Sequence, residues 1–368
     1  MEDILCIGCG APIQTKYKDK LGYTPQSALE KGMETGELYC QRCFRLRHYN
    51  EITDVQLTDD DFLRLLHEVG DSNALVVNVV DIFDFNGSVI PGLPRFVAGN
   101  DVLLVGNKKD ILPKSVKTSK VTQWLMERAH EEGLRPVDVV LTSAQNKQAI
   151  KELIEKIEQY RKGRDVYVVG VTNVGKSTLI NAIIQEITGD KEIITTSRFP
   201  GTTLDKIEIP LADGSHIYDT PGIIHRHQMA HYLSAKNLKY VSPKKEIKPK
   251  TYQLNPEQTL FLGGLGRFDF VSGDKQGFTA YFDNELKLHR TKLVGAGEFY
   301  EKHVGSLLTP PSKKEVADFP QLVKHELKIE AKTDVVFSGL GWIRVIGPAQ
   351  IAVWAPEEVA VVTRKAII

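Results

Sequence analysis

The stretch Gly170-Val171-Thr172-Asn173-Val174-Gly175-Lys176-Ser177 decides the fold of this chain. Two glycines enclose four residues and are followed by Lys and Ser, which is the P-loop pattern. The run Asp165–Val169 before it predicts a strand, and Lys176–Ile187 after it predicts a helix. In that context the backbone N–H groups of the loop and the helix N-terminus face phosphates. The stretch therefore predicts a nucleotide site, with a plain glycine-rich turn as the alternative.

The residues of this loop have separate expected roles. Lys176 would neutralise the β- and γ-phosphates, and the Ser177 hydroxyl would bind Mg²⁺. The residues of this segment predicted to contact the nucleotide are Gly170, Asn173, Val174, Gly175, Lys176, Ser177 and Thr178.

Two short motifs after the P-loop support the nucleotide site over the turn. Asp219-Thr220-Pro221-Gly222 follows a predicted strand, where Asp219 can hold Mg²⁺ through water and the Gly222 N–H can meet the γ-phosphate. In Pro200-Gly201-Thr202-Thr203, Thr202 would contact the nucleotide and Thr203 could complete the magnesium shell. The expected catalytic groups are Lys176, Thr203 and Gly222, and the expected magnesium ligands are Ser177, Thr203 and Asp219.

Two loops before the P-loop indicate which base is bound. Asn107-Lys108-Lys109-Asp110 and Thr142-Ser143-Ala144 each end a predicted strand. A carboxylate at Asp110 can accept from both N1–H and the 2-amino group of guanine, and a site built around that pair rejects adenine. Asn107 and Lys108 would brace the base and the P-loop, while Ser143 and Ala144 would offer backbone donors. GTP and GDP are therefore the expected ligands.

Strand and helix patterns alternate from Asp59 to about Ile224, which predicts a mostly parallel sheet with helices on both faces. The predicted strands are Ala74–Val80, Asp101–Gly106, Val137–Leu141, Asp165–Val169, Leu204–Pro210 and Ser215–Tyr218. The predicted helices are Val121–Glu132, Ala149–Tyr160 and Lys176–Ile187. Because the base-reading loops precede the P-loop, the sequence predicts a circularly permuted P-loop GTPase domain over residues 58–228.

All four cysteines lie in the first 43 residues, as the pairs Cys6/Cys9 and Cys40/Cys43. Two such pairs supply the four thiolates of a tetrahedral Zn²⁺ site, with disulfides or free thiols as the alternatives. Residues 1–57 are therefore predicted to form a zinc-binding module, in which Lys16–Gly36 is a long loop or an insertion. Basic residues beside the second cysteine pair form a candidate cationic surface: Arg42, Arg45, Arg47 and His48.

The remaining residues, 229–368, predict a separate strand-rich α+β domain. Strand-like runs cover Phe268–Val271, Gly277–Phe282 and Val335–Trp354. The phrases Gly264–Phe268 and Gly339–Ile343 echo each other, which hints at a duplication. A second candidate cationic surface follows the GTPase segment: Lys236, Lys239, Lys244, Lys245, Lys248 and Lys250.

Composition restricts the function classes. The chain has 368 residues with 47 basic and 47 acidic side chains, so any nucleic-acid binding has to rest on local surfaces. No apolar run approaches the roughly 20 residues that span a bilayer, and no basic region followed by an apolar stretch opens the chain. We expect no membrane contact and a cytoplasmic location.

The order of these motifs and the cysteine pairs resemble the YqeH family of circularly permuted ribosome-assembly GTPases. The resemblance implies a role in biogenesis of the small (30S) ribosomal subunit, with rRNA or ribosomal proteins as partners. It also implies that Asn173 helps to bind a K⁺ against the phosphates, as in related potassium-stimulated GTPases. Stabilisation of the loop alone is the other interpretation of Asn173.

The expected chemistry is slow GTP hydrolysis. Ile223 and Ile224 stand where many small GTPases have a glutamine that orients the attacking water. His225 and His227 lie nearby in sequence and are more typical of solvated loop positions. A non-hydrolytic GTP-sensing scaffold that recruits protein partners is the alternative function. A P-loop kinase is a third, which Asp110 disfavours.

Overall fold

The structure is a computed structural model that describes residues 4–7, 11–18, 20, 22–36, 38–49, 59–188, 207–220, 222, 227–234 and 236–368. The chain divides into two compact units, and each is described by itself. The first unit comprises Met1–Lys109 and Thr122–Ile224, and the second comprises Asp110–Val121 and His225–Ile368. Among the described residues, no helix has the length and apolar character needed to cross a membrane.

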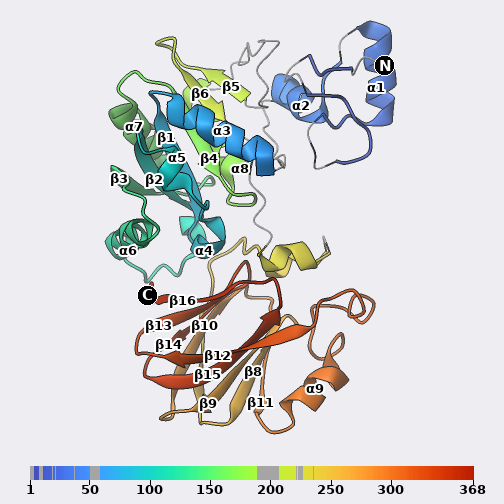
Figure 1. The fold of residues 1–368 in the computed structure, drawn as a ribbon, viewed down its shortest axis with the longest axis vertical. Helices are drawn as coiled ribbons and strands as arrows, with labels where there is room; N and C mark the ends of the chain where they lie inside the picture. Colours follow the sequence, from blue (N-terminus) through green and yellow to red (C-terminus); the bar gives the residue numbers. More distant parts are fainter. Residues whose placement is uncertain are drawn as a thin grey trace. The chain divides into compact units, whose positions relative to one another are not determined.

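A six-stranded sheet forms the centre of the first unit within the described residues, in the order β3-β2-β1-β4-β6-β5 (Figure 1). Neighbouring strands are parallel except for β5, which runs antiparallel to β6. The strands are β1 Leu75–Asp81, β2 Asp101–Asn107, β3 Asp138–Leu141, β4 Val166–Gly170, β5 Ile207–Pro210 and β6 His216–Asp219. The P-loop strand β4 lies between β1 and β6, which come from before and after it in the chain. This arrangement confirms the predicted mostly parallel sheet.

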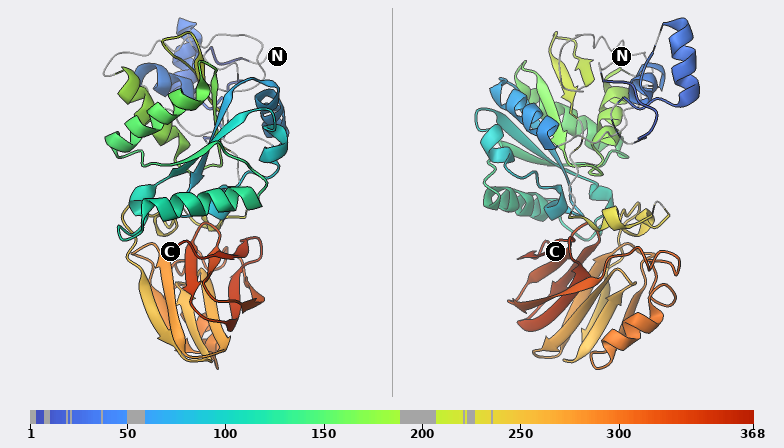
Figure 2. Two further views of the ribbon diagram at one scale, coloured as in Figure 1. Left: turned by 90° about the vertical axis from the view of Figure 1, so that its left-hand side faces the viewer. Right: turned by 45° about the vertical axis from the view of Figure 1, so that its right-hand side comes forward.

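Helices cover both faces of this sheet, which explains its continuous apolar strands. Every residue of β1 and of β4 is buried, as expected for strands covered on both sides. Helices α7 and α8 pack against each other on one face, and α3 lies with α5 on the other (Figures 1 and 2). The helices are α3 Asp59–Asp71, α4 Phe85–Ser88, α5 Leu93–Phe96, α6 Thr118–Glu131, α7 Lys147–Arg161 and α8 Lys176–Thr188.

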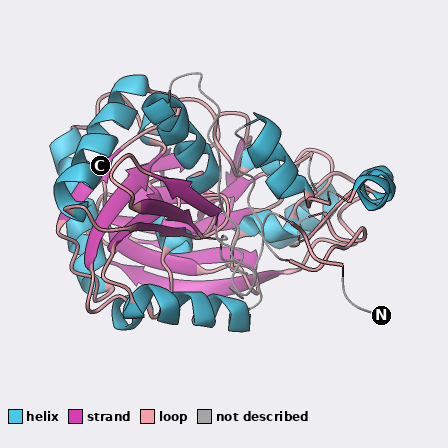
Figure 3. Ribbon diagram, turned by 90° about the horizontal axis from the view of Figure 1, so that it is seen from above, coloured by secondary structure: helices cyan, strands magenta, loops and turns pink. Residues whose placement is uncertain are grey.

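The N-terminal segment contains more helix than its sequence predicts. Its helices are α1 Gln26–Thr35 and α2 Gln41–Tyr49, and loops with two isolated bridges, Leu5–Pro12 and Gln14–Tyr23, precede them in the described residues (Figure 3). The prediction of a long loop over Lys16–Gly36 was therefore wrong for its second half. Helix α1 buries only Gly32, and its apolar residues are few, so the composition of this segment favoured a loop. Pro25 before it and Gly36 after it were the available signals.

The second unit is dominated by two five-stranded antiparallel sheets, which residues 250–365 form with every residue described. Their orders are β16-β13-β14-β10-β7 and β11-β8-β9-β15-β12. The strands are β7 Lys250–Leu254, β8 Gln258–Leu262, β9 Gly266–Ser272, β10 Gln276–Phe282, β11 Leu288–Lys292, β12 Leu322–Ile329, β13 Thr333–Phe337, β14 Gly341–Val345, β15 Ala349–Pro356 and β16 Val361–Lys365, with helix α9 at Ala296–His303. The predicted run Val335–Trp354 contains parts of three strands, separated by turns at Ser338–Leu340 and Ile346–Pro348.

The strand orders reveal an internal duplication. Strands that are five apart in the chain, such as β8 and β13, occupy the same position in the two sheets. Interchanging all five such pairs converts the order of one sheet into the order of the other. The echoing phrases Gly264–Phe268 and Gly339–Ile343 lie at corresponding turns, before β9 and before β14. Each half contributes three strands to one sheet and two to the other, so β7 and β10 of the first half lie in the sheet built mainly by the second half, and β12 and β15 lie in the sheet built mainly by the first.

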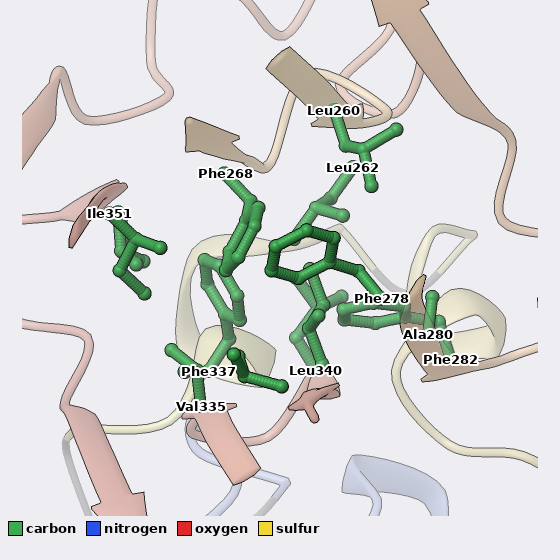
Figure 4. Packing of buried hydrophobic residues seen from close by; sticks show 14 of the residues in the cluster. Leu260, Leu262, Phe268, Phe278, Ala280, Phe282, Val335, Phe337, Leu340 and Ile351 are labelled. Atoms are coloured by element: carbon green, nitrogen blue, oxygen red, sulfur yellow. The ribbon is translucent and has the colours of Figure 1, made fainter. Parts of the chain in front are cut away.

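Side chains of both sheets fill the space between them (Figure 4). Phe268 and Phe270 from one sheet meet Phe278 from the other, with ring centroids 5.3 and 4.9 Å apart. All three rings are fully buried, together with Phe337 and Leu340. The alternation of apolar and polar residues along these strands places one face of each sheet in this shared core.

Candidate nucleotide site

The P-loop occupies the turn between the end of β4 at Gly170 and the start of α8 at Lys176. Asn173 and Gly175 have left-handed backbone conformations, with φ of 68° and 83°. A Cβ atom on Gly175 would lie 2.6 Å from Nδ2 of Asn107, closer than side chains approach one another. Glycine is therefore required at this position both by the backbone angle and by the packing against Asn107.

The first base-reading loop contacts the P-loop directly. The Asn107 side chain is buried, and its Nδ2 donates to the carbonyl of Val174 over 2.9 Å. Lys108 Nζ donates to the carbonyl of Asn173 over 2.8 Å and forms an ion pair with Asp81 over 2.6 Å. The two contacts with the P-loop join residues that are 67 and 65 positions apart. They bring Asn107 and Lys108 to the phosphate loop, as a permuted nucleotide site requires.

The second base-reading loop joins the first at the ends of β2 and β3. The Lys109 N–H donates to the carbonyl of Thr142 over 3.0 Å, and the Thr142 N–H donates to Gly106 over 2.8 Å. Ser143 is buried and Ala144 is half-buried. Asp110 lies in the 3-10 helix Lys109–Ile111 with an exposed side chain. Its carboxylate is therefore accessible to a ligand.

The P-loop lysine meets the residues that follow β6. Lys176 is 2% exposed, and its Nζ donates to the Asp219 carboxylate and to the Thr220 carbonyl. A Cβ on Gly222 would lie 3.1 Å from Cγ2 of Thr172, so the loop after β6 approaches the P-loop closely. A buried ammonium requires anionic or carbonyl partners, and phosphates can replace those it has here.

These residues fit a nucleoside phosphate with Mg²⁺. Asp219 and Ser177 are both buried beside the P-loop, and carboxylate and hydroxyl oxygens suit that ion. Bound Mg²⁺ supplies charge neutralisation at the phosphates. Lys176 and the loop amides would hold the β- and γ-phosphates, while the Gly222 amide would lie near the γ-phosphate. The assigned roles of these residues stay predictions, and Thr178 follows Ser177 within α8.

Two charged residues near this site were missed by the sequence reasoning. Asp81 ends β1 and holds Lys108, and an acid at the carboxyl end of a buried strand was an available signal. Arg42, from the N-terminal segment, donates from Nη2 to Oδ2 of Asp219 over 3.1 Å. The two residues are 177 positions apart, so no local pattern links them.

Several predicted residues lie outside the part of the chain that the structure describes. They are Thr202, Thr203, Cys9, Ile223, Ile224 and His225. His227 is described, and its Nδ1 lies 3.0 Å from the Glu358 carbonyl at an exposed position. That contact lies within the second unit. The exposed turn position of His227 agrees with the solvated loop residue that the sequence predicts.

Three of the four cysteines form a cluster. The Sγ atoms of Cys6, Cys40 and Cys43 all lie within 4.8 Å of one another, and all three residues are buried. The Cys40 N–H donates to the Cys6 sulfur over 3.1 Å. Zn–S distances of about 2.3 Å place the thiolates of a tetrahedral site about 3.8 Å apart, so this cluster is compatible with Zn²⁺.

Comparison with known proteins finds matches to the P-loop part of the GTPase domain and to the C-terminal part of the chain. The family described as "YqeH-like, C-terminal" matches residues 275–367, and the family described as "50S ribosome-binding GTPase" matches residues 165–257. The uncharacterized protein YqeH of Bacillus subtilis is 59% identical over the full length of both chains. NO-associated protein 1 of Arabidopsis thaliana is 33% identical over 92% of this chain and 69% of its own. The GDP-bound structure of TM YlqF is 27% identical over 50% of this chain and 66% of its own, with a TM-score of 0.31.

The full-length similarity and the two family matches confirm the resemblance drawn from the motif order. The GTPase match begins at β4 and includes the P-loop, while the base-reading loops precede it in the chain. GTP or GDP and Mg²⁺ are the ligands that this activity implies. The chain belongs to the YqeH family and is a circularly permuted GTPase.

Proposed function

We propose that this GTPase acts as an assembly switch on the small ribosomal subunit, with rRNA or ribosomal proteins as its partners. The observation that carries the proposal is the lysine segment of the second unit. All six of its lysines are exposed: Lys236, Lys239, Lys244, Lys245, Lys248 and Lys250. Among them only Lys239 forms a described ion pair, with Glu285 over 2.9 Å. A row of exposed ammonium groups suits RNA phosphates.

Two further observations bear on this proposal. The family that matches residues 165–257 is described as ribosome-binding, although its description names the 50S particle. In contrast, the basic cluster expected beside Cys43 is reduced, because Arg42 is buried against Asp219. Arg45 is exposed, and the side chains of Arg47 and His48 lie outside the described part of the structure. The lysine segment is thus the stronger candidate for RNA contact.

The cysteine cluster supports a second part of the proposal, a structural Zn²⁺ ion. Cys6, Cys40 and Cys43 supply three thiolates, and Cys9 is the fourth ligand that the sequence provides. A site closed by four thiolates organises a small fold and leaves no position open for chemistry. Measurement of one zinc per purified chain, lost in Cys40→Ser, tests this assignment.

The ribosomal role is tested by co-sedimentation of the full-length protein with separated small and large subunits, in GTP and in GDP. We expect GTP-dependent binding to the small subunit that weakens with increasing salt. Replacing Lys244 and Lys245 by alanine should weaken it, whereas replacing Lys313 and Lys314, also exposed in the second unit, should not. Binding to the large subunit alone, or to neither, would contradict the proposal. Binding only to ribosome-free protein partners would favour a scaffold role.

A further inference from the structure

Asp219, the predicted magnesium aspartate, is held by two cations from distant parts of the chain. Lys176 of the P-loop bonds to its Oδ1, and Arg42 bonds to its Oδ2 over 3.1 Å. Both cations and the carboxylate are nearly inaccessible, with Asp219 only 1% and Arg42 5% exposed. A buried guanidinium–carboxylate pair is specific in geometry, and it is costly to separate unless another charge replaces the lost partner.

The position of Arg42 is set by the cysteine cluster. Arg42 lies between Cys40 and Cys43, two of the three clustered thiols, at the start of helix α2. The backbone on either side is fixed, because the Cys40 N–H bonds to the Cys6 sulfur and the Phe44 N–H bonds to the Cys40 carbonyl over 2.9 Å. Any movement of this cluster therefore moves Arg42 relative to Asp219.

Binding of Mg²⁺ changes the charge balance at Asp219. A carboxylate that already faces two unit positive charges would meet a divalent cation as well, and like charges repel strongly at buried positions. Lys176 has an alternative partner, because the phosphates that arrive with Mg²⁺ lie beside the P-loop. Arg42 comes from a different segment of the chain, and it bonds to the same carboxylate that Mg²⁺ would approach.

We propose that Arg42 and Mg²⁺ compete for Asp219, so that binding of Mg²⁺ with guanine nucleotide releases the cysteine segment from the GTPase site. Arg42 is in this sense a positioning residue, which holds the cysteine segment against the site when Mg²⁺ is absent. Coupling of this kind is reciprocal: release of the segment strengthens Mg²⁺ binding by the same factor by which Mg²⁺ weakens the docking. The inference depends on the GTPase site and is independent of any ribosomal role.

The first test measures how much Mg²⁺ is needed for tight nucleotide binding. Fluorescent GDP is titrated into the full-length protein at a series of free Mg²⁺ concentrations. Arg42→Ala removes the competitor and should lower the Mg²⁺ concentration at half-maximal tightening by about tenfold. Arg45→Ala, an exposed arginine on the same helix, is the matched control and should leave it unchanged. An unchanged or higher Mg²⁺ requirement in Arg42→Ala would overturn the proposal.

The second test needs no variant, so it stands even if Arg42→Ala folds poorly. Hydrogen exchange of the α2 amides is compared between protein in EDTA and protein with Mg²⁺ and GDP. Release predicts faster exchange of α2 when Mg²⁺ and GDP are bound. Slower or equal exchange would refute release.

Discussion

Replacing Gly175 with alanine should weaken GDP binding by about 30- to 700-fold, because the free P-loop would relax to another conformation and GDP binding would have to restore the native one. The native φ of 83° lies in the left-handed region, which costs a residue with a Cβ about 1–2 kcal/mol. The new Cβ would also lie 2.6 Å from Nδ2 of Asn107. Displacing that amide breaks its bond to the Val174 carbonyl and leaves buried groups unpaired, at about 1–2 kcal/mol. The sum, about 2–4 kcal/mol, converts to the stated factor at about 1.4 kcal/mol per tenfold.

The assay is a fluorescence titration with a labelled GDP at saturating Mg²⁺, accompanied by thermal unfolding. Gly163→Ala is the matched control, because Gly163 has a φ of 78° but no atom lies within 4 Å of a Cβ built there. It should lower stability by about 1–2 kcal/mol through backbone strain alone and leave the Kd unchanged. A Kd for Gly175→Ala within threefold of wild type would refute the reasoning. An equal loss of GDP affinity in Gly163→Ala would refute it as well.

Four further predictions concern base recognition, potassium, acid stability and metal. Asp110→Ala should weaken GDP binding by more than about 100-fold in calorimetry without changing the unfolding temperature, because the exposed carboxylate is expected to bond to the guanine base of the ligand. Equal affinity would argue against Asp110 as the base-reading residue. GTP turnover should be faster in KCl than in NaCl if Asn173 helps to bind K⁺, and equal rates would exclude that role. Hydrogen bonds, first from Ser234 and then from Ser312, lower the pKa of Glu315 to about 2 from its ordinary 4.5. The folded-state pKa is below the unfolded one, so its stabilisation is present above pH 4.5 and is lost as the pH falls toward 2. Glu315→Gln should therefore lose less stability than wild type on acidification, as followed by circular dichroism, and an equal acid sensitivity would contradict the assignment. Chelation of bound metal should lower the unfolding temperature in wild type but not in Cys40→Ser; an equal drop in both would place the metal elsewhere.

The GTPase sheet could be predicted because its signals are local. The buried strands are continuous apolar runs, and the motifs at Gly170–Ser177, Asn107–Asp110 and Asp219–Gly222 each stand at the carboxyl end of a strand. Parallel strands bring those ends to one edge of a sheet, so the motif order alone was sufficient to predict a permuted site.

Other features depend on contacts that no local pattern records. The ion pair of Arg42 with Asp219 joins two segments of the chain, and Arg42 by itself resembled a surface charge beside a metal ligand. Helix α1 has few apolar residues and buries only Gly32, so composition favoured a loop. The run Val335–Trp354 is apolar across two turns, which hides the borders of three strands.

The exchange of two strands between the duplicated halves, β7 and β10 for β12 and β15, has a consequence for how the second unit can fold. A chain ending before β12 would leave β9 without its neighbour β15, and β10 without β14. Unpaired strand edges of that kind associate with other chains. The first half therefore cannot fold by itself while the ribosome is still synthesising the second half. Both sheets are complete only once β16 has been synthesised. This unit should therefore acquire its protease resistance in a single late step.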